Sequence, residues 1–379
     1  MGIVGSVLQD SVTQGTGQSF IKADFSTPDG QMLMRLTRDV WQFASAKNYQ
    51  QMRDMTLALV DDDGKLRNFN DFEVAAKSIN TKYNRTWLKT EHDHAIGSST
   101  MASRWAEFRE NADDQPFLIY RTVGDQNVRH EHQLLNGIIR KMTDDFWKKY
   151  YPPNGWKCRC DAEQLATGSA KETEPLPKVP VDDLFATNLA VTGMVFPKGH
   201  AYYKGVPVDV MKRAVASLPD NVAYNTVIKD EATGKRVDLH IYHGIQETAE
   251  NIDIASRLME EGYNVKLLPI VDRDFNDIRE LVYGTKQFKT GRNPDALVGK
   301  KLFEFKSMHG KTTHKTIQRH ISKASKQAEN IYIKLHEEIA DRDVNRAVTG
   351  VLNQSMSINE VWVENGGKLI KKQNSNYKK

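Results

Sequence analysis

The chain has 379 residues and a net charge of +4, and 39% of its residues are hydrophobic and 27% charged. Such a composition is typical of a globular protein, and the length is sufficient for two or three domains. Only two cysteines are present, which excludes a disulfide framework. Because the net charge is small, any affinity for nucleic acid must come from local patches of basic residues.

The sequence predicts neither a membrane span nor a secretory signal. Its apolar runs, such as Phe117–Tyr120, are far shorter than the roughly 20 residues that cross a bilayer. The N-terminal residues MGIVGSVLQDSVTQ have no basic segment before an apolar core. We therefore expect synthesis in a cytoplasm, which the resemblance described below implies is that of a bacterial host.

The N-terminal third is predicted to be mainly helical. Residues 1–29 are polar and rich in Gly, Ser and Thr, which predicts a loose arm. Between Gln31 and Arg109, apolar residues recur three and four positions apart, a spacing typical of helices. His92 and His94 lie two positions apart in the last of these helices, so they point in different directions and are expected to be solvated. Phe117–Val123 is the first predicted strand.

Residues 168–217 are predicted to be a linker and connector. Their first part, Gly168–Asp183, is rich in Pro, Lys and Glu, as flexible linkers often are. The segment 188–207 holds two turn clusters and several aromatic residues, and its pattern indicates no function. A short helix then leads into the last domain.

Residues 218–379 are predicted to form an α/β domain, because strand and helix patterns alternate along them. A conspicuous hairpin at 294–307 has Gly299-Lys300 as its turn. The predicted elements are, in order, a strand at 237–244, a helix at 248–262, a strand at 263–271, an inserted helix within 272–290, the hairpin at 294–307, a helix at 311–330, a strand at 330–335, a helix from 337 and a hairpin closed by Asn365-Gly366-Gly367.

Both cysteines lie in a stretch, Arg121–Cys160, that is dense in special-purpose residues. It contains Arg129-x-x-His132, Gly137, Phe146-Trp147 and the run Tyr151-Pro-Pro-Asn-Gly-Trp-x-Cys-x-Cys160. With the residues before it, this stretch resembles the phage Mu F-like head morphogenesis family of minor capsid proteins over residues 83–165. The resemblance implies a virion protein with phage portal or capsid partners. It places a mainly α Mu F-like domain with a small β element at residues 30–167.

The same stretch offers a candidate metal site. Cys158 and Cys160 are two positions apart, so their sulfurs lie on one face of an extended segment. His132 would add an imidazole, and His130 or Asp161 a fourth ligand, to complete a tetrahedral Zn²⁺ site. In the alternative interpretation, both cysteines pack as small hydrophobic side chains in an aromatic core.

A second cluster, NPDALVGKKLFEFK at Asn293–Lys306, has the form PD…ExK. Asp295 and Glu304 lie on the two strands of the predicted hairpin, so both carboxylates can converge on Mg²⁺ or Mn²⁺. Lys306 is two residues beyond Glu304 and therefore on the same face of the strand. There it would orient or deprotonate the attacking water, or neutralise charge on the phosphate. The preceding helix offers Glu247 or Glu250 as a further ligand.

The charge pattern around this cluster indicates contact with phosphates. Between Leu281 and Ala328 the only acidic residues are Asp295 and Glu304, while eleven Lys and Arg occur from Lys286 to Lys326. A solvated surface of mixed charge would scatter its acids through such a stretch. The predicted nucleic-acid-binding residues are Lys311, Lys315, Arg319, Lys323 and Lys326.

The element order and the hairpin resemble the PD-(D/E)xK nuclease superfamily, and the wider segment resembles the C-terminal toxin nucleases of contact-dependent inhibition systems. The resemblance implies an endonuclease that cleaves tRNA or another RNA, or DNA, with a cognate immunity protein as partner. Two alternatives remain open. One is a purely structural virion protein whose basic C-terminal domain binds packaged DNA or a protein. The other is a metal-independent ribonuclease of the barnase, EndoU or RelE-like kind, which would use His309, Thr313, His314, Arg319 or His320.

Overall fold

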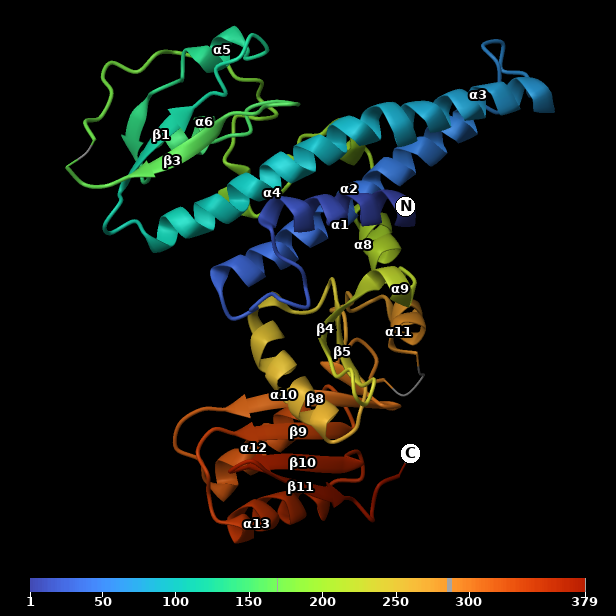
Figure 1. The fold of residues 1–379 in the computed structure, drawn as a ribbon. Coiled ribbons are helices and arrows are strands. Elements are labelled where there is room, and N and C mark those ends of the chain that lie inside the picture. Colours follow the sequence, from blue (N-terminus) through green and yellow to red (C-terminus); the bar gives the residue numbers. More distant parts are fainter. Residues whose placement is uncertain (169, 285–287, 379) are drawn as a thin grey trace. The chain divides into compact units, whose positions relative to one another are not determined.

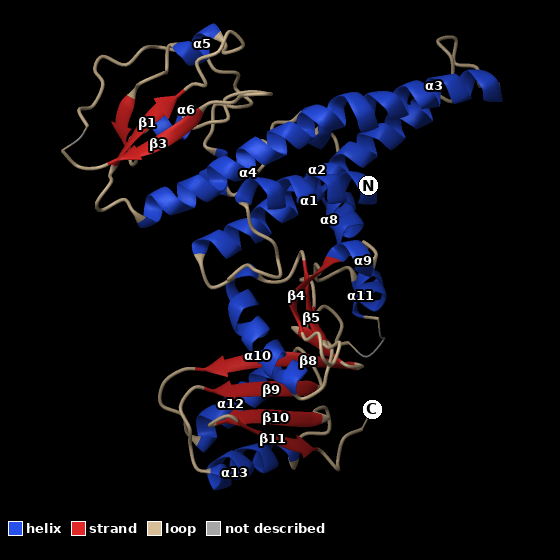
Figure 2. Cartoon of the chain, in the orientation of Figure 1, coloured by secondary structure: helices blue, strands red, loops and turns tan. Residues whose placement is uncertain are grey.

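The computed structural model describes residues 1–168, 170–284 and 288–378 (Figure 1). The chain divides into two compact units. The first comprises residues 1–19 and 27–215, and the second comprises residues 20–26 and 216–379. Helices dominate the first unit, whereas the second is built on an eight-stranded sheet (Figure 2). The chain is therefore multi-domain, with an α-rich unit before an α/β unit.

The long helices of the first unit begin at capping residues that the sequence supplies. Thr27 accepts a hydrogen bond from the Gly30 amide, and Pro28 occupies the first turn of α2. Asn68 caps α3 in the same way, through the Asp71 amide. The helices are α1 (Gly2–Thr16), α2 (Pro28–Leu57), α3 (Phe69–Thr81) and α4 (Leu88–Glu110), with a π-helical turn at Lys82–Trp87 before α4.

The prediction of a loose arm over residues 1–29 was wrong for its first half, because Gly2–Thr16 forms helix α1. The small residues that suggested flexibility instead permit close packing. A Cβ added at Gly5 would lie 2.2 Å from the Trp41 ring, and one at Gly15 would lie 2.5 Å from the Ile96 carbonyl oxygen. The glycines therefore let α1 approach α2 and α4 closely.

The segment 188–207 packs against these helices and is not a free linker. The Asp39 carboxylate accepts hydrogen bonds of 2.8 and 2.9 Å from the Val195 and Phe196 amides. His94 is buried, with its Nε2 3.1 Å from the Val195 carbonyl oxygen, and burial lowers its pKa to about 4. The expectation of a solvated His94 was therefore wrong, whereas His92 is exposed as expected.

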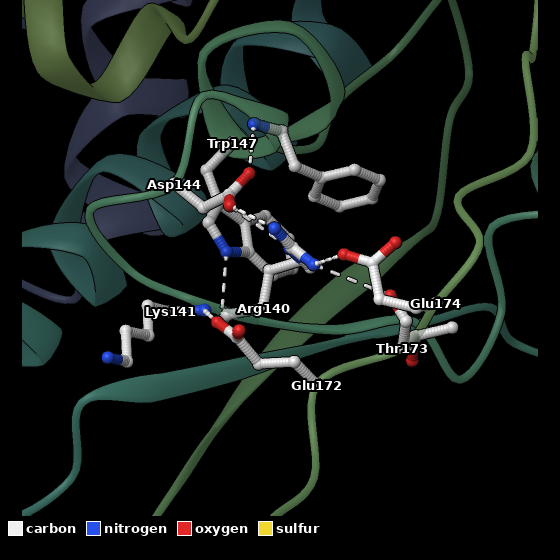
Figure 3. A network of polar contacts seen from close by, with 8 residues as sticks. Arg140, Lys141, Asp144, Trp147, Glu172, Thr173 and Glu174 are labelled. Atoms are coloured by element: carbon white, nitrogen blue, oxygen red, sulfur yellow. Dashed lines mark hydrogen bonds and ion pairs between the residues drawn. The ribbon is translucent and has the colours of Figure 1, made fainter.

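A small antiparallel sheet completes the first unit, with strand order β2-β1-β3. In β2, Arg140 pairs with Asp144 and Glu174 (Figure 3). The Thr173 hydroxyl accepts a hydrogen bond of 3.0 Å from the Ile139 amide. Part of the predicted linker is thereby fixed along β2. The remaining elements are β1 (Phe117–Arg121), α5 (His130–Gln133), β2 (Ile139–Lys141), α6 (Phe146–Tyr150), β3 (Asp161–Leu165), α7 (Leu189–Thr192), a 3₁₀ turn (Ala201–Tyr203) and α8 (Val208–Ala216).

The second unit has a mixed sheet in the order β11-β10-β9-β8-β7-β6-β5-β4. The pairs β5–β6, β8–β9 and β9–β10 are parallel, and the other pairs are antiparallel. Its strands are β4 (Tyr224–Lys229), β5 (Arg236–His240), β6 (Val265–Leu267), β7 (Ala296–Val298), β8 (Lys301–Met308), β9 (Asn330–Leu335), β10 (Glu360–Asn365) and β11 (Lys368–Gln373). Its helices are α9 (Asp220–Ala223), a 3₁₀ turn (Ile245–Glu247), α10 (Thr248–Glu260), α11 (Asn276–Tyr283), α12 (His314–Ala324) and α13 (Asp341–Leu352).

Helices cover both faces of this sheet. Apolar residues of α12 and α13, such as Ile317 and Val348, pack in one core cluster with Ile331 and Ile333 of β9. On the other face, Lys334 of β9 pairs with an aspartate of α10. Since Glu304 and Lys306 of β8 are in register with Ile331 and Ile333, they face α12 and α13. None of the helices in the described parts of the chain has the length and hydropathy that a membrane crossing requires.

Candidate functional site

The β7–β8 hairpin brings Asp295, Glu304 and Lys306 together. Asp295 directly precedes β7, and its Oδ2 accepts a hydrogen bond of 2.7 Å from the Phe305 amide of β8. The Lys306 Nζ lies 2.6 Å from Glu304 Oε1 and also donates to the Phe305 carbonyl oxygen at 2.8 Å. The two carboxylates are only 8% and 4% exposed. Backbone contacts across one short turn thus fix the geometry of all three groups.

These three residues line a polar cavity of about 260 Å³. Of the two helix acids named from the sequence, Glu247 lines the cavity, whereas Glu250 is exposed and its Oε1 lies 3.0 Å from the His309 Nε2. The Glu247 carboxylate lies against Gly244, where an added Cβ would be 2.3 Å from Oε1. The lining residues are His243, Glu247, Leu268, Pro269, Ile270, Asn293, Pro294, Asp295, Glu304, Lys306 and Gln327.

Burial and mutual repulsion set the protonation of this group. Burial, with the Asp295 charge adding to it, raises the pKa of Glu304 to about 8. Burial alone would lower the pKa of Lys306, but the charges of Glu304 and Asp295 outweigh it and the net shift is upward. Burial followed by the Asp295 charge also raises the pKa of Glu247. The lysine therefore stays charged, and the acids hold an extra proton near neutral pH.

One carboxylate oxygen in the cavity is unsatisfied. Glu304 Oε2 is buried and has no hydrogen-bond partner within the described residues. Leaving a buried polar oxygen without a partner is costly, so such an atom in a native fold requires an explanation. A bound cation that prefers oxygen ligands would be such an explanation, because the cavity offers carboxylate oxygens.

A hydrogen-bond network holds the loop that precedes Asp295. Asn293 Oδ1 accepts from the Tyr283 hydroxyl at 2.8 Å and from the Val271 amide at 3.1 Å. Arg279 is fully buried and donates to the carbonyl oxygens of Val271 and Arg292 at 2.7 and 2.8 Å. Sequence reasoning missed Arg279 and Tyr283, because their partners are the Asn293 side chain and backbone atoms of loops that no local pattern indicates.

His243 is a second lining residue that sequence reasoning missed. Its Nδ1 lies 2.7 Å from the Leu268 carbonyl oxygen, and its Nε2 lies 3.0 Å from the Asn251 side-chain amide. It follows β5, and Leu268 follows the parallel neighbour β6. Since the carboxyl ends of parallel strands share one edge of a sheet, the position of His243 at the end of the predicted strand 237–244 was the signal that could have found it.

The five predicted nucleic-acid-binding residues, Lys311, Lys315, Arg319, Lys323 and Lys326, are all exposed on or beside α12. Burial and the nearby charges of Arg319, Lys323 and Lys306 lower the pKa of His320, which lies on the same helix. Other members of the basic stretch have structural partners: Lys289 bonds the Ser325 carbonyl oxygen, and Lys301 pairs with Glu360. Lys286 lies outside the described residues.

The residues named for a metal-independent ribonuclease lie elsewhere. The His309 ring stacks on His336 with centroids 4.0 Å apart, and Thr313 caps α12 through the Thr316 amide. His314, Arg319 and His320 lie on α12. Among the described residues that line the cavity, none belongs to this set.

In the first unit, the structure brings His132, Cys158 and Cys160 together. His132 Nδ1 lies 3.7 Å from Cys158 Sγ and 3.4 Å from Cys160 Sγ. The predicted fourth ligands are not part of this cluster, because His130 is exposed and Asp161 pairs with an arginine of α4. Among the described residues, these three form the one group of three or more potential metal ligands, and their ligating atoms lie within 4.8 Å of one another.

Fold and sites thus define a protein in which an α-rich unit with a thiol–imidazole cluster precedes an α/β unit with an acidic cavity. Two family models match these units separately. Residues 4–163 match the phage Mu protein F like protein family, and residues 292–369 match the contact-dependent growth inhibition CdiA C-terminal domain. The chain therefore carries a phage Mu F-like domain followed by a toxin-like domain of the CdiA type.

Individual relatives also match part of the chain. The Mu-like prophage FluMu F protein of Haemophilus influenzae is 38% identical over 103 residues, and the putative capsid assembly protein F of Escherichia phage Mu is 39% identical over 102 residues. Each match covers 27% of this chain and 23% of the relative, so the chain spans less than a quarter of the length of these proteins. No solved structure matches the chain.

Proposed function

We propose that the second unit is a metal-dependent nuclease that hydrolyses phosphodiester bonds in tRNA or another RNA, or in DNA. One observation carries this proposal. Asp295, Glu304 and Lys306 share a polar cavity of about 260 Å³, in which the buried Glu304 Oε2 has no partner among the described residues. A cation between the carboxylates would satisfy that oxygen and neutralise their repulsion.

The residues present suit Mg²⁺ or Mn²⁺. Mg²⁺ is usually held by one or two carboxylates, with water and substrate phosphate as its other ligands. Asp295 and Glu304 would hold it here, and Glu247, which lines the same cavity, would reach it through water. When bound, such a cation polarises the phosphate and acidifies a coordinated water.

The chain's own residues divide the remaining work. Because the pKa of Lys306 is raised, its ammonium group stays protonated and would neutralise charge on the reacting phosphate rather than act as a base. The exposed cations of α12, including Arg319 and Lys323, would bind the nucleic-acid backbone next to the cavity. The CdiA-type match covers the hairpin residues Asp295–Lys306 and α12 together, which supports a shared role.

The first unit supports the proposal that this activity belongs to a phage particle. The relatives that it resembles are a capsid assembly protein and a prophage F protein. We infer that this chain is virion-associated, contacts phage portal or capsid proteins, and carries the nuclease as an effector. A cognate immunity protein is the expected partner of a toxin-like domain.

Cleavage of tRNA and of DNA by the purified full-length chain, with and without Mg²⁺, tests the nuclease. Asp295→Asn and Glu304→Gln should each lower the cleavage rate by about 100-fold or more, since a catalytic metal contributes several kcal/mol and each 1.36 kcal/mol is tenfold in rate. Glu360→Gln is the matched control. Glu360 is also a buried carboxylate of the sheet, but both of its oxygens are bonded, to Lys301 and Trp362.

Three outcomes are informative. Loss of cleavage in the Asp295 and Glu304 variants, with activity retained in Glu360→Gln, supports the proposal. Cleavage that persists in excess chelator and in both variants points to the metal-independent alternative. If the chain cleaves nothing and its expression is harmless to bacteria, the second unit is a structural nucleic-acid-binding domain. Toxicity that Lys306→Ala relieves would argue against that last interpretation.

A further inference from the structure

The thiol–imidazole cluster of the first unit has the dimensions of a zinc site. In a tetrahedral site with Zn–S near 2.3 Å and Zn–N near 2.0–2.1 Å, a nitrogen and a sulfur ligand lie about 3.6 Å apart. The distances from His132 Nδ1 to the sulfurs of Cys158 and Cys160 are 3.7 and 3.4 Å. One of the two observed distances is slightly longer and the other slightly shorter than this ideal nitrogen–sulfur distance.

Both sulfurs have several polar contacts in this cluster: Cys158 contacts His132 and Cys160, and Cys160 also contacts Tyr120. The arrangement around His132 Nδ1 is the feature that points to a shared metal ligand. A neutral imidazole has one nitrogen lone pair that accepts a proton, so Nδ1 of His132 accepts well from one thiol only. Here two sulfurs approach the same nitrogen, and Cys160 is buried while Cys158 is half-buried. We propose that the first unit binds one Zn²⁺ ion through His132 Nδ1, Cys158 Sγ and Cys160 Sγ, with a water molecule as fourth ligand.

The space beside the cluster fits the fourth ligand. A cavity of about 10 Å³ adjoins the three side chains, which is room for about one water molecule. Neither His130 nor Asp161 supplies a ligand atom within the cluster. Three protein ligands and one water is the coordination of zinc sites that keep an exchangeable position.

The backbone and its charges favour the same assignment. Lys157 has φ = 58°, the only positive φ of a non-glycine residue in the described parts of the chain. This left-handed residue precedes Cys158, and such strain persists only where the surrounding structure requires it. Lys157, Arg159 and Arg129 also line the cavity, so their positive charges would stabilise two thiolates.

A zinc ion here would join parts of the chain that are distant in sequence. His132 lies in α5, and the cysteines directly precede β3. The ion would then cross-link three short elements, which are α5, the turn at Gly155–Cys158 and the start of β3. Because the ligands must be deprotonated and a preformed site rarely exists in an unfolded chain, the free energy of zinc binding would add to that of folding.

Metal analysis of the full-length chain, purified without a metal-chelating tag, tests this proposal. We expect one zinc ion per chain after dialysis, and a Co²⁺-substituted protein with a thiolate-to-cobalt charge-transfer band. Cys160→Ser and His132→Gln should each lower zinc retention by about tenfold or more, since even the outer partners of a zinc ligand contribute 10–100-fold to affinity. His130→Gln is the matched control, because it removes an exposed histidine two residues away and should retain zinc.

If a variant of a zinc ligand fails to fold, measurements on the wild-type chain still test the proposal. A strong chelator should lower the melting temperature of the wild-type first unit, and added zinc should restore it. Glu304→Gln should retain zinc in full, which separates this metal from the proposed nuclease cation. A folded wild-type chain that holds no zinc and shows no charge-transfer band with Co²⁺ would overturn the proposal. So would a chain whose two thiols form a disulfide and exclude the metal.

Discussion

The two clusters differ in the atoms they offer to a metal ion and in the free space beside them. One cluster is His132, Cys158 and Cys160, and the other is Asp295, Glu304 and Lys306. The first offers nitrogen and sulfur atoms around a cavity of about 10 Å³, and the second offers oxygens around one of about 260 Å³. The smaller cavity has room for about one water molecule, whereas the larger has room for a phosphate. The difference in free volume agrees with the two proposals, a zinc cross-link at the first cluster and a reaction at the second.

Strand β8 contributes a lysine to each of two lysine–glutamate ion pairs, and these pairs differ in one respect. Lys301 and Lys306 each pair with a buried glutamate, at 2.5 and 2.6 Å. Both oxygens of Glu360, the partner of Lys301, are bonded, whereas Oε2 of Glu304 has no partner in the described residues. Two pairs with the same residue types thus differ in one unsatisfied atom, which supports the proposal that the pair in the cavity is the reactive one.

The largest expected effect on the cleavage rate comes from removing the lysine of each of these two ion pairs separately. Lys306→Met should lower the cleavage rate by about 100-fold or more, because a positioned catalytic group contributes roughly 10²–10⁴-fold. Lys301→Met should lower it only a few-fold, since that lysine is half-exposed and outside the cavity. Single-turnover cleavage of one RNA substrate measures both. Equal losses in the two variants would mean that β8 is merely destabilised.

An intermediate effect concerns pH and the free energy of unfolding of the second unit. The pKa of Glu304 is raised to about 8, so the stability it contributes is present below its unfolded pKa and is lost as pH rises through 8. Without divalent metal, the wild type should therefore lose more stability than Glu304→Gln between pH 5 and about 8.5. Hydrogen exchange of β8 and β9 measures this. Parallel pH profiles for the two proteins would contradict the prediction.

Added Mg²⁺ should reverse that loss in the wild type. The cation competes with the proton on Glu304, so the stabilisation it provides should grow as pH rises from 6 to 8. In Glu304→Gln the stabilisation should be small and independent of pH. The same exchange measurement at fixed Mg²⁺ concentration reports both proteins.

The smallest effect is expected on α12. Arg319→Gln and Lys323→Gln should weaken nucleic-acid binding several-fold and reduce the dependence of the binding constant on salt by about one released counterion each. Both side chains are exposed, so the stability of the second unit should not change. Binding titrations at several salt concentrations with catalytically inactive protein measure the slope. An unchanged slope would place the nucleic acid elsewhere.

Local patterns were sufficient to predict the hairpin that holds the candidate site. The hairpin at 294–307 and its turn at Gly299-Lys300 were confirmed, and Gly299 has the positive φ that the turn requires. The same holds for the last hairpin, whose turn residues Gly366 and Gly367 both have positive φ. Turn chemistry and strand periodicity act within a few residues, so a single sequence reveals them.

Features that depend on distant partners were not predictable. The Gly, Ser and Thr content of α1 indicated flexibility, but it serves close packing against helices 30 or more residues away. From the helix pattern alone, Glu247 and Glu250 are equally plausible as further ligands. Only the fold shows that Glu250 contacts His309 instead of lining the cavity. Strand β4 was missed as well, because it forms the edge of the sheet beside β5 and has few fully buried side chains.

The separation of the two clusters is tested most directly by measuring zinc content and RNA cleavage on the same preparations of wild type, Glu304→Gln and Cys160→Ser. Glu304→Gln should retain its zinc and lose cleavage by about 100-fold or more. Cys160→Ser should lose zinc and, at a temperature where it stays folded, cleave RNA at close to the wild-type rate. Full cleavage by Glu304→Gln, or loss of cleavage by folded Cys160→Ser, would contradict the assignment of the reaction to the second unit's acidic cavity.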